Sequence, residues 1–435
     1  MTRPTKSPSK SPRQRLHALA AAFLFLAAAA PALHAAATCN PRRYGAKADG
    51  ATKDTAAIQA AIDACERQGG GTVVLTAGTY LSAPIVLKSD INLRIDKGAT
   101  LLGSPDHADY PAITEFRAPG VQALVSAVNA ANVTISGDGV IDGNGASWWK
   151  MARSFKGSGA MGSPHPRPRL VVFDHCRHVV VEGITIENSP MWQLVPYYSD
   201  DVTIRNVRIL SPARSPNTDA IDPFSSSHVL IEHVFADVGD DNVAIKSGVP
   251  NSPGPDAPSR EVTIRDCTFL HGHGISVGSE LAGGAQDILA ERINFDGTDN
   301  GIRIKANRDR GHPVTHLVFR DIQMKDVKNA IVISEYYPRI VPPAGGVAPA
   351  PVTRLTPHFH DILIENVTAT GGTMAGAIVG LPEAPVTGVV LRNVTLSARK
   401  GLTIGYAEVT GQNVVVHAAA GPPITKLADA NVALK

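Results

Sequence analysis

The 435-residue sequence is poor in aromatic side chains, in cysteine and in charge. Aromatic residues make up 5%, there are four cysteines, and charged residues are 18% against 43% hydrophobic. Such a balance excludes intrinsic disorder as the main state of the chain. The hydrophobic residues are mostly Val, Ile, Ala and Leu, and the chain has 39 Gly and 32 Pro. This composition favours many short strands joined by tight turns, an all-β fold.

No segment has the roughly 20 apolar residues that a membrane-spanning helix requires. The main apolar run, Ala18 to Ala30, follows a basic stretch and precedes the small residues Ala35 to Ala37. This order predicts a secretory signal peptide over residues 1–37, cleaved near Ala37, rather than a retained membrane anchor or a lipoprotein signal. We therefore expect a secreted protein, extracellular or periplasmic, in a compartment that permits disulfides.

The net charge gives no reason to expect a nucleic-acid partner. The formal charge is +2, and the first 37 residues carry five basic residues and no acid, so the mature chain has 2 − 5 = −3. A slightly acidic chain has no general electrostatic attraction for nucleic acid.

From about Asn132 onward the sequence repeats one phrase: an alternating apolar strand, a polar turn, a second short strand and another turn. Where no loop intervenes the step is 23 to 29 residues, for example from residue 202 to 229. Longer steps occur where Pro and Gly gather, in residues 143–169, 249–260 and 337–357, which we interpret as loop insertions. The first strands begin at Val133, Val179, Val202, Val229, Val262, Ile288, Leu317, Ile362, Val389 and Val414.

A period in the twenties, with short β-branched strands and no helical spacing between them, predicts a parallel β-helix. Leucine-rich repeats share this length, but their Leu and Asn signature is missing. Each coil of such a solenoid stacks only on its neighbours, so residues 38–435 are expected to form a single domain. Residues 38–100 would hold the N-terminal cap and the first coils.

A helix is predicted to cover the first coil, because a stacked solenoid leaves an open strand edge at each end. Asp54 and Thr55 are typical of a helix start, and apolar residues follow at helical spacing until the glycines at residues 69–71. These glycines are interpreted as a turn rather than a phosphate loop, since no Lys-Ser/Thr follows. The apolar positions are Ile58, Ala61, Ile62 and Cys65.

The repeat also restricts the disulfides. Cys176 and Cys267 lie near strand anchors three coils apart, roughly 14 Å at about 4.8 Å per coil, which exceeds the roughly 7 Å limit for a bridge. Cys39 and Cys65 both fall in the cap region and are the predicted disulfide. Cys176 and Cys267 are then expected to be buried thiols.

Five hexapeptides that contain the second strand of the repeat align without a gap, starting at Asp219, Asp241, His273, Asn300 and Asn329. Their third and fifth positions are apolar, apart from one proline, and must face the core. The fourth and sixth positions then face outward, which places Arg303 and Lys305 together on an exposed face. Alternation would send the first column inward, so a bend must turn those side chains out if they are to work.

Three carboxylates therefore meet in two adjacent coils: Asp219, Asp240 and Asp241. Crowded carboxyl groups push their pKa values apart, so one can keep a proton while the others ionise. Cleavage of a glycosidic bond needs such a pair, an acid for the leaving oxygen and a carboxylate to activate water. The cations of the neighbouring coils suggest an anionic ligand. Turn-forming aspartates and a calcium site are the alternative interpretations.

Four motifs in this order resemble the signature of the polygalacturonases, glycoside hydrolase family 28, and especially of its bacterial members. The resemblance runs from about Tyr44 to the last coils. It implies a right-handed parallel β-helix that hydrolyses α-1,4-galacturonosidic bonds of polygalacturonate or pectin with inversion, without a cofactor or metal. The motifs are Asn217-Thr218-Asp219, Gly239-Asp240-Asp241, Gly272-His273-Gly274 and Arg303-Ile304-Lys305.

The same resemblance implies a role for each residue of the site. Asp240 would be the general acid, while Asp219 and Asp241 would activate water. His273 would support the ionisation pattern of these carboxylates. The residues expected to bind substrate, mainly the galacturonate carboxylates, are Arg303, Lys305, Asn217 and Tyr337, although Tyr336 is adjacent to the last of these.

Several alternatives stay open from sequence. A pectate lyase would act on the same polymer with Ca²⁺, and a non-catalytic β-helix would only bind polysaccharide. Decorated pectins, xylogalacturonan or rhamnogalacturonan, are alternative substrates. We expect a monomer with endo action rather than exo action. The insertions at residues 143–169, with Trp148 and Trp149, and 337–357 could nevertheless wall off one end of a cleft.

Overall fold

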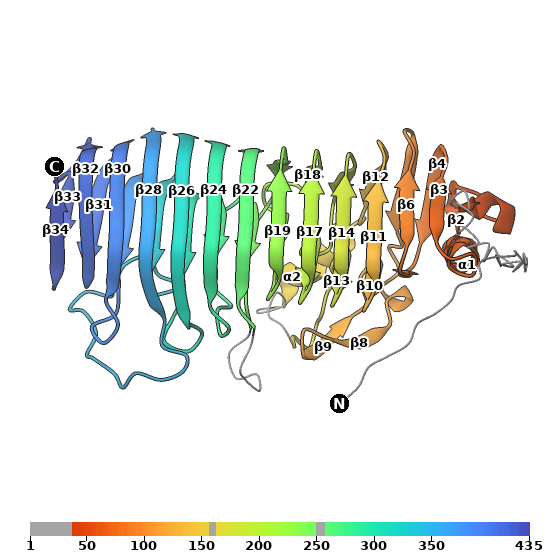
Figure 1. Cartoon of the computed structure of the whole chain (residues 1–435), viewed down its shortest axis with the longest axis horizontal. Coiled ribbons are helices and arrows are strands. Elements are labelled where there is room, and N and C mark those ends of the chain that lie inside the picture. Colours follow the sequence, from red (N-terminus) through yellow and green to blue (C-terminus); the bar gives the residue numbers. More distant parts are fainter. Residues whose placement is uncertain (1–36, 156–161, 249–256) are drawn as a thin grey trace, which may run out of the picture. The chain divides into compact units, whose positions relative to one another are not determined.

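The computed structural model describes residues 37–155, 162–248 and 257–435. The predicted signal peptide lies outside the described residues except for Ala37, which begins β1. All pairings between strands of the described chain are parallel except in the hairpin of β8 and β9. Figure 1 shows successive strands side by side in sequence order. The prediction of an all-β parallel β-helix is therefore confirmed.

Each coil contributes strands to three ladders. In the first coils the strands of two of these ladders are separate, and from β22 to β32 they join into single strands of 11 to 13 residues. All of them belong to one 21-stranded sheet, which also contains the five-residue β34. Its strands are β1 (Ala37–Cys39), β2 (Asp49–Lys53), β3 (Gly71–Leu75), β4 (Gly78–Ser82), β6 (Ile91–Ile95), β7 (Ala99–Gly103), β11 (Ala131–Ser136), β12 (Val140–Asp142), β14 (Arg177–Glu182), β15 (Thr185–Glu187), β17 (Asp200–Arg205), β18 (Arg208–Leu210), β19 (Ser227–Glu232), β20 (Phe235–Asp237), β22 (Ser259–Phe269), β24 (Ala285–Asp296), β26 (Pro313–Lys325), β28 (His358–Thr370), β30 (Val386–Ala398), β32 (Ala407–Ala418) and β34 (Ala430–Leu434).

The remaining ladder carries the predicted site. It consists of a four-stranded and a seven-stranded sheet, which isolated bridges link through Ile221. The four-stranded sheet is β5 (Ile85–Leu87), β10 (Val125–Val128), β13 (Val171–Asp174) and β16 (Leu194–Tyr197). The seven-stranded sheet is β21 (Val243–Ile245), β23 (Ile275–Val277), β25 (Asn300–Lys305), β27 (Asn329–Ser334), β29 (Met374–Val379), β31 (Lys400–Gly405) and β33 (Ile424–Lys426).

The register of this ladder is the one predicted from the hexapeptides. Ile221, Val243, Ile275, Ile302 and Ile331 pair in succession, one per coil. All five side chains are fully buried and belong to the main hydrophobic cluster. β-branched side chains stacked in register fill the inside of the solenoid, because each coil repeats the shape of the one below it.

One predicted strand anchor is wrong. Val389 pairs with Val409, whereas Val414 pairs with Val394 in the second half of the same strands. The step from Val389 to the next strand anchor is therefore 20 residues, ending at Val409, rather than the 25 residues to Val414. Gly411 interrupts the Val-x-Ile pattern of this strand, so the apolar run at Val414 resembles an anchor more closely in sequence.

The helix α1 (Thr55–Glu66) caps the first coil as predicted, with its apolar residues buried. Asp54 precedes it, and its buried carboxylate accepts hydrogen bonds from the backbone of Lys47 and Ala48 at 2.7 and 2.8 Å. The predicted disulfide between Cys39 and Cys65 is confirmed, with their Cα atoms 6.0 Å apart. Cys176 and Cys267 are free and buried, as predicted.

The first insertion contains a helix that the sequence interpretation missed. α2 (Ala146–Ser154) buries Trp148, Trp149 and Ala152, and the indole of Trp149 donates to the carbonyl of Ser189 at 2.9 Å. Before it stands the hairpin of β8 (Ala112–Glu115) and β9 (Ala118–Val121). Short 3₁₀ segments cover Pro41–Tyr44 and His107–Asp109. Among the described residues, none of the helices is long and apolar enough to cross a membrane.

Candidate active site

At Asp241 and His273 the column of polar residues leaves regular strand geometry through a bend, whereas Asn300 and Asn329 are already the first residues of β25 and β27. β21 begins at Val243 and β23 at Ile275, so Asp241 and His273 stand just before regular strand geometry starts. Gly272 has φ +123°, and a Cβ there would lie 2.6 Å from the carbonyl oxygen of Asp240. The glycine beside His273 therefore permits the tight turn that the expected bend requires.

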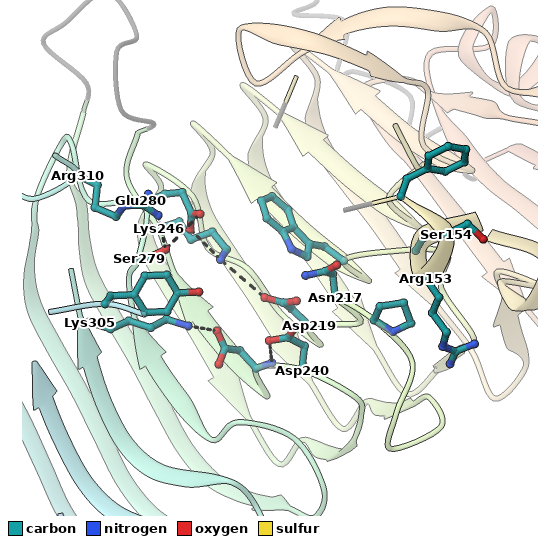
Figure 2. Close-up of a pocket in the computed structure, with 16 residues that line it drawn as sticks. Arg153, Ser154, Asn217, Asp219, Asp240, Lys246, Ser279, Glu280, Lys305 and Arg310 are labelled. Carbon is teal, nitrogen blue, oxygen red and sulfur yellow. Dashed lines mark hydrogen bonds and ion pairs between the residues drawn. The ribbon is translucent and has the colours of Figure 1, made fainter. Parts of the chain in front are cut away.

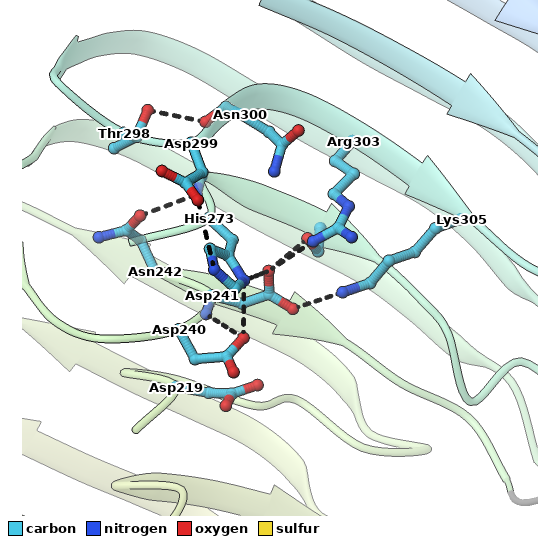
Figure 3. Close-up of polar contacts among 12 residues, drawn as sticks. Asp219, Asp240, Asp241, Asn242, His273, Thr298, Asp299, Asn300, Arg303 and Lys305 are labelled. Carbon is cyan, nitrogen blue, oxygen red and sulfur yellow. Dashed lines mark hydrogen bonds and ion pairs between the residues drawn. The ribbon is translucent and has the colours of Figure 1, made fainter. Parts of the chain in front are cut away.

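Asp241 is buried, and Figure 3 shows its carboxylate beside the side chains of His273, Arg303 and Lys305. Its carboxylate lies 2.7 Å from the Nζ of Lys305 and 3.6 Å from the guanidinium of Arg303, and it accepts a 2.7 Å hydrogen bond from Ser276. Burial alone would raise the pKa of Asp241, but the two cations outweigh burial and hold this pKa well below its usual range. The contacts with Lys305 and Arg303 therefore favour the ionised form of Asp241.

Asp240 and His273 form a second pair. The Nδ1 of His273 lies 2.9 Å from Asp240 and 3.9 Å from Asp241. Burial opposes a charge on the imidazole, but the hydrogen bond to Asp240 and the charges of Asp240 and Asp241 raise the pKa of His273 above its ordinary value. The ligand atoms of these three residues lie within 4.8 Å of one another, a spacing that a metal ion could also use.

The surroundings of Asp219 disfavour its ionised form, unlike those of Asp241. It is buried, and its Oδ1 has no hydrogen-bond partner among the described residues. Burial first, and then the charges of Asp240 and Asp222, raise the pKa of Asp219 well above its usual range, while Lys246 at 3.7 Å acts in the opposite direction. The aspartates thus have strongly different environments, as expected for an acid and base site.

The three aspartates, Lys246 and Lys305 line one cavity of about 800 Å³ (Figure 2). Asn217 lies on its wall and is held by the buried guanidinium of Arg167, 2.6 Å from its Oδ1. Tyr337 faces the cavity, with its ring over Lys305 and Arg310, whereas Tyr336 is buried in a separate apolar cluster. The cavity residues are Ala152, Arg153, Ser154, Phe155, Trp192, Pro216, Asn217, Asp219, Asp240, Asp241, Lys246, Ser279, Glu280, Lys305, Arg310 and Tyr337.

The expectation that Arg303 and Lys305 are two exposed cations is wrong for Lys305. Its side chain is 7% exposed and is bound to Asp241, and Arg303, 16% exposed, also faces this carboxylate. A bend that turns Asp241 outward brings it onto the face of Arg303 and Lys305, so part of their charge is neutralised within the protein.

Four residues of the site were not found by sequence reasoning: Trp192, Arg167, Lys246 and Arg310. Lys246 carried a signal, because it occupies the sixth position of its hexapeptide, as Lys305 does. Trp192 is in register with Asp219 one coil earlier, but it lies outside the five aligned hexapeptides. Arg167 and Arg310 come from an insertion and a turn, whose positions the repeat does not determine.

A parallel β-helix with three aspartates and basic residues in one cavity, and a histidine paired with one of these aspartates, defines a class of polysaccharide-cleaving enzymes. Residues 65–418 match the family described as glycosyl hydrolases family 28. The chain belongs to this family and is a glycoside hydrolase of the polygalacturonase type.

Three related proteins match most of the chain. A probable polygalacturonase of Vitis vinifera is 31% identical over 378 residues, which cover 81% of this chain and 73% of the relative. An endo-polygalacturonase of Pectobacterium parmentieri is 32% identical over 308 residues, with 67% and 74% covered. The crystal structure of a hyperthermoactive exopolygalacturonase from Thermotoga maritima superposes with a TM-score of 0.77 at 29% identity, covering 89% of this chain and 93% of that one.

Proposed function

We propose that this enzyme hydrolyses the α-1,4-galacturonosidic bonds of polygalacturonate in pectin by a single displacement with inversion. Asp240, hydrogen-bonded to His273, protonates the leaving oxygen. Asp219 and Asp241 activate the attacking water. The observation that carries this proposal is the meeting of all three carboxylates in one cavity, where the ionised Asp241 is separated in pKa from Asp219.

The charge of the cavity supports an anionic sugar as substrate. Lys305 and Arg310 stand on one side of the aspartates and Arg153 on the other, all on the cavity wall. Lys305 is bound to the buried Asp241. Arg310 instead pairs at 3.2 Å with Asp309, whose side chain is 62% exposed, so Arg310 is the cation best placed to pair with a galacturonate carboxylate. The Tyr337 ring beside both cations offers an apolar face for the sugar.

For the mode of cleavage we propose exo action, release of short products from a chain end. The column of Asp219 continues toward the N-terminus as Trp192 and Arg169, one residue per coil, and these are only 4% and 5% exposed. Phe116, from the turn of the β8–β9 hairpin, covers both, with its ring 4.6 Å from the guanidinium of Arg169. A cleft covered one coil beyond Asp219 leaves little room for a polymer to pass through.

This proposal differs from the endo action expected from sequence, and a product profile decides between them. Purified enzyme should release mono- or digalacturonate from polygalacturonate as the earliest product, with a slow fall in viscosity. A ladder of intermediate oligomers and a rapid loss of viscosity would establish endo action. Absence of new reducing ends would contradict hydrolysis itself.

A further inference from the structure

Lys246 is a buried lysine whose position repeats that of Lys305. The register of the ladder places Lys246, Gly278 and Lys305 in one column, on three successive coils. Lys305 binds the carboxylate of Asp241 at 2.7 Å. Lys246 lies on the coil that carries Asp241 and faces back toward Asp219, at 3.7 Å. Both carboxylates proposed to activate water thus lie close to a lysine, Asp241 to Lys305 and Asp219 to Lys246.

Lys246 is enclosed by protein, not by solvent. Its side chain is 5% exposed, and the ammonium stands 4.7 Å from the centre of the Trp192 ring. Three carboxylates surround it, Glu280 at 3.2 Å, Asp222 at 3.6 Å and Asp219 at 3.7 Å. Figure 2 shows Lys246 between Glu280 and Asp219.

One cation faces three carboxylates, of which Asp219 and Asp222 are buried and Glu280 is 21% exposed. Burying two carboxylates beside a cation that is hydrogen-bonded to a third favours a proton on one of the buried pair. Glu280 makes the direct hydrogen bond to Lys246, and although burial opposes its ionisation, Lys246 and Lys305 lower the pKa of Glu280. Asp222 is fully buried, and neither of its oxygens has a hydrogen-bond partner among the described residues. Burial raises the pKa of Asp222 to about 7 and also raises the pKa of Asp219. Asp219 lines the cavity, whereas Asp222 does not and lacks hydrogen-bond partners within the described part of the chain, so Asp222 is assigned as the group that keeps the proton.

We infer that Lys246 is a positioning residue of the reaction, which holds Asp219 as a carboxylate as Lys305 holds Asp241, and that Asp222 is its uncharged neighbour. This inference rests on the role proposed above for Asp219. The other charged groups that act on the Asp219 carboxylate are Asp240, Asp241 and the guanidinium of Arg167, and none of them is altered in the test below.

The test is the pH profile of kcat/KM on polygalacturonate, whose acidic limb reports the ionisation of the base in the free enzyme. Removing the cation raises the pKa of Asp219, so the acidic limb of Lys246→Met should move to higher pH by about one unit or more. Activity below the limb then falls about tenfold or more, whereas the loss at the high-pH plateau is smaller. Lys325→Met, which removes an exposed lysine paired with Asp296, is the matched control and should leave the limb in place.

Asp222→Asn tests the second half of the inference. The amide has the shape and the lack of charge of a protonated carboxyl group, so the acidic limb should stay within about 0.3 pH units of the wild-type position, whatever the maximal rate. A limb displaced to lower pH would show that Asp222 is ionised in the working enzyme and would overturn its assignment.

Loss of a buried cation can also prevent folding, which circular dichroism would reveal. The double variant Lys246→Met/Glu280→Gln removes the hydrogen-bonded ion pair as a unit and should show the same displaced limb. A folded Lys246 variant with a reduced rate but an unmoved limb would make Lys246 merely structural. Asp219→Asn is measured alongside: if it stays active, the proposed function is wrong, whereas an inactive Asp219→Asn with an unmoved limb in the Lys246 variants contradicts this inference alone.

Discussion

The Nζ of Lys305 lies 2.7 Å from the carboxylate of Asp241, although 64 residues separate them in sequence. Asp241 stands before β21 and Lys305 ends β25, two coils further along the ladder. Lys305, which the sequence predicts to bind substrate, therefore also pairs with Asp241, a proposed catalytic residue. Its substitution cannot affect substrate binding alone.

Replacing Asp240 with Asn should abolish hydrolysis without changing the fold. The amide keeps the shape of the carboxyl group but has no acidic proton for the leaving oxygen. We expect kcat to fall by about three orders of magnitude or more, with an unchanged circular dichroism spectrum. An Asp240→Asn enzyme with more than about a tenth of the wild-type activity would remove Asp240 from the role of general acid.

The first product formed from the α-linked polymer should be the β-anomer. Attack by a water held by Asp219 and Asp241, on the face opposite the bond protonated by Asp240, inverts the anomeric carbon. Proton NMR within minutes of mixing, before mutarotation, measures the anomer directly. An initial α-anomer would indicate a covalent intermediate, and unsaturated products would indicate a lyase.

Arg310→Ala should weaken activity on polygalacturonate by about tenfold and have much less effect on the methyl-esterified polymer, because Arg310 is proposed to pair with a carboxylate. Added salt should narrow this difference. Lys305→Ala should reduce activity on both substrates, since it also removes the partner of Asp241. Arg94→Ala, which alters an exposed pair with Asp96, is the control. Equal losses on both polymers in Arg310→Ala would exclude a carboxylate contact.

Removal of metal ions should leave the rate unchanged. The proposed chemistry uses only carboxylates, although Asp240, Asp241 and His273 have a spacing suited to a cation. Activity of enzyme dialysed against a chelator is compared with activity after addition of Ca²⁺. Loss of activity that Ca²⁺ restores would favour the calcium-dependent lyase alternative or a metal at these three residues.

The stability of the enzyme should depend on Asp222 between pH 5 and pH 8. Burial raises the folded-state pKa of Asp222 to about 7, above its ordinary value of 3.8. The folded protein therefore binds more protons than the unfolded chain between these values, and the free energy of unfolding falls as pH rises toward 7. The Asp222→Asn variant has no carboxyl group to ionise, so it does not lose this stability as pH rises. Its melting temperature relative to wild type should rise by about 2–5 °C from pH 5 to pH 8, and a constant difference would contradict the shifted pKa.

Much of the fold could be predicted because every coil repeats the same physical requirement. Ile221, Val243 and Ile275 must fill equivalent places in the core, so their spacing determined both the ladder and its register. The prediction failed where the sequence departs from that requirement, at Gly411 in β32 and in the insertion that forms α2. A non-repeating segment carries only local signals of its structure.

The candidate site was accessible from sequence to the extent that it lies on the ladder. Asp219, Asp241, His273, Arg303 and Lys305 occupy registered positions, and the structure places them around one another. Trp192 is in register with Asp219 but precedes the aligned hexapeptides, whereas Arg167 and Arg310 come from an insertion and a turn. The contribution of these two arginines to the cavity depends on how loops pack, which periodicity does not describe.

The sequence by itself determined the β-helix, the register of its hexapeptides and the Cys39–Cys65 disulfide. It also determined that Asp219, Asp240 and Asp241 meet in two adjacent coils. These features follow from residue type and spacing, because stacked coils place equivalent positions above one another. Only the tertiary structure decided the charge of each group. Ionisation depends on burial and on partners within a few ångströms, so the bend that directs Asp241 toward Lys305 and leaves Asp219 beside Lys246 separates their pKa values.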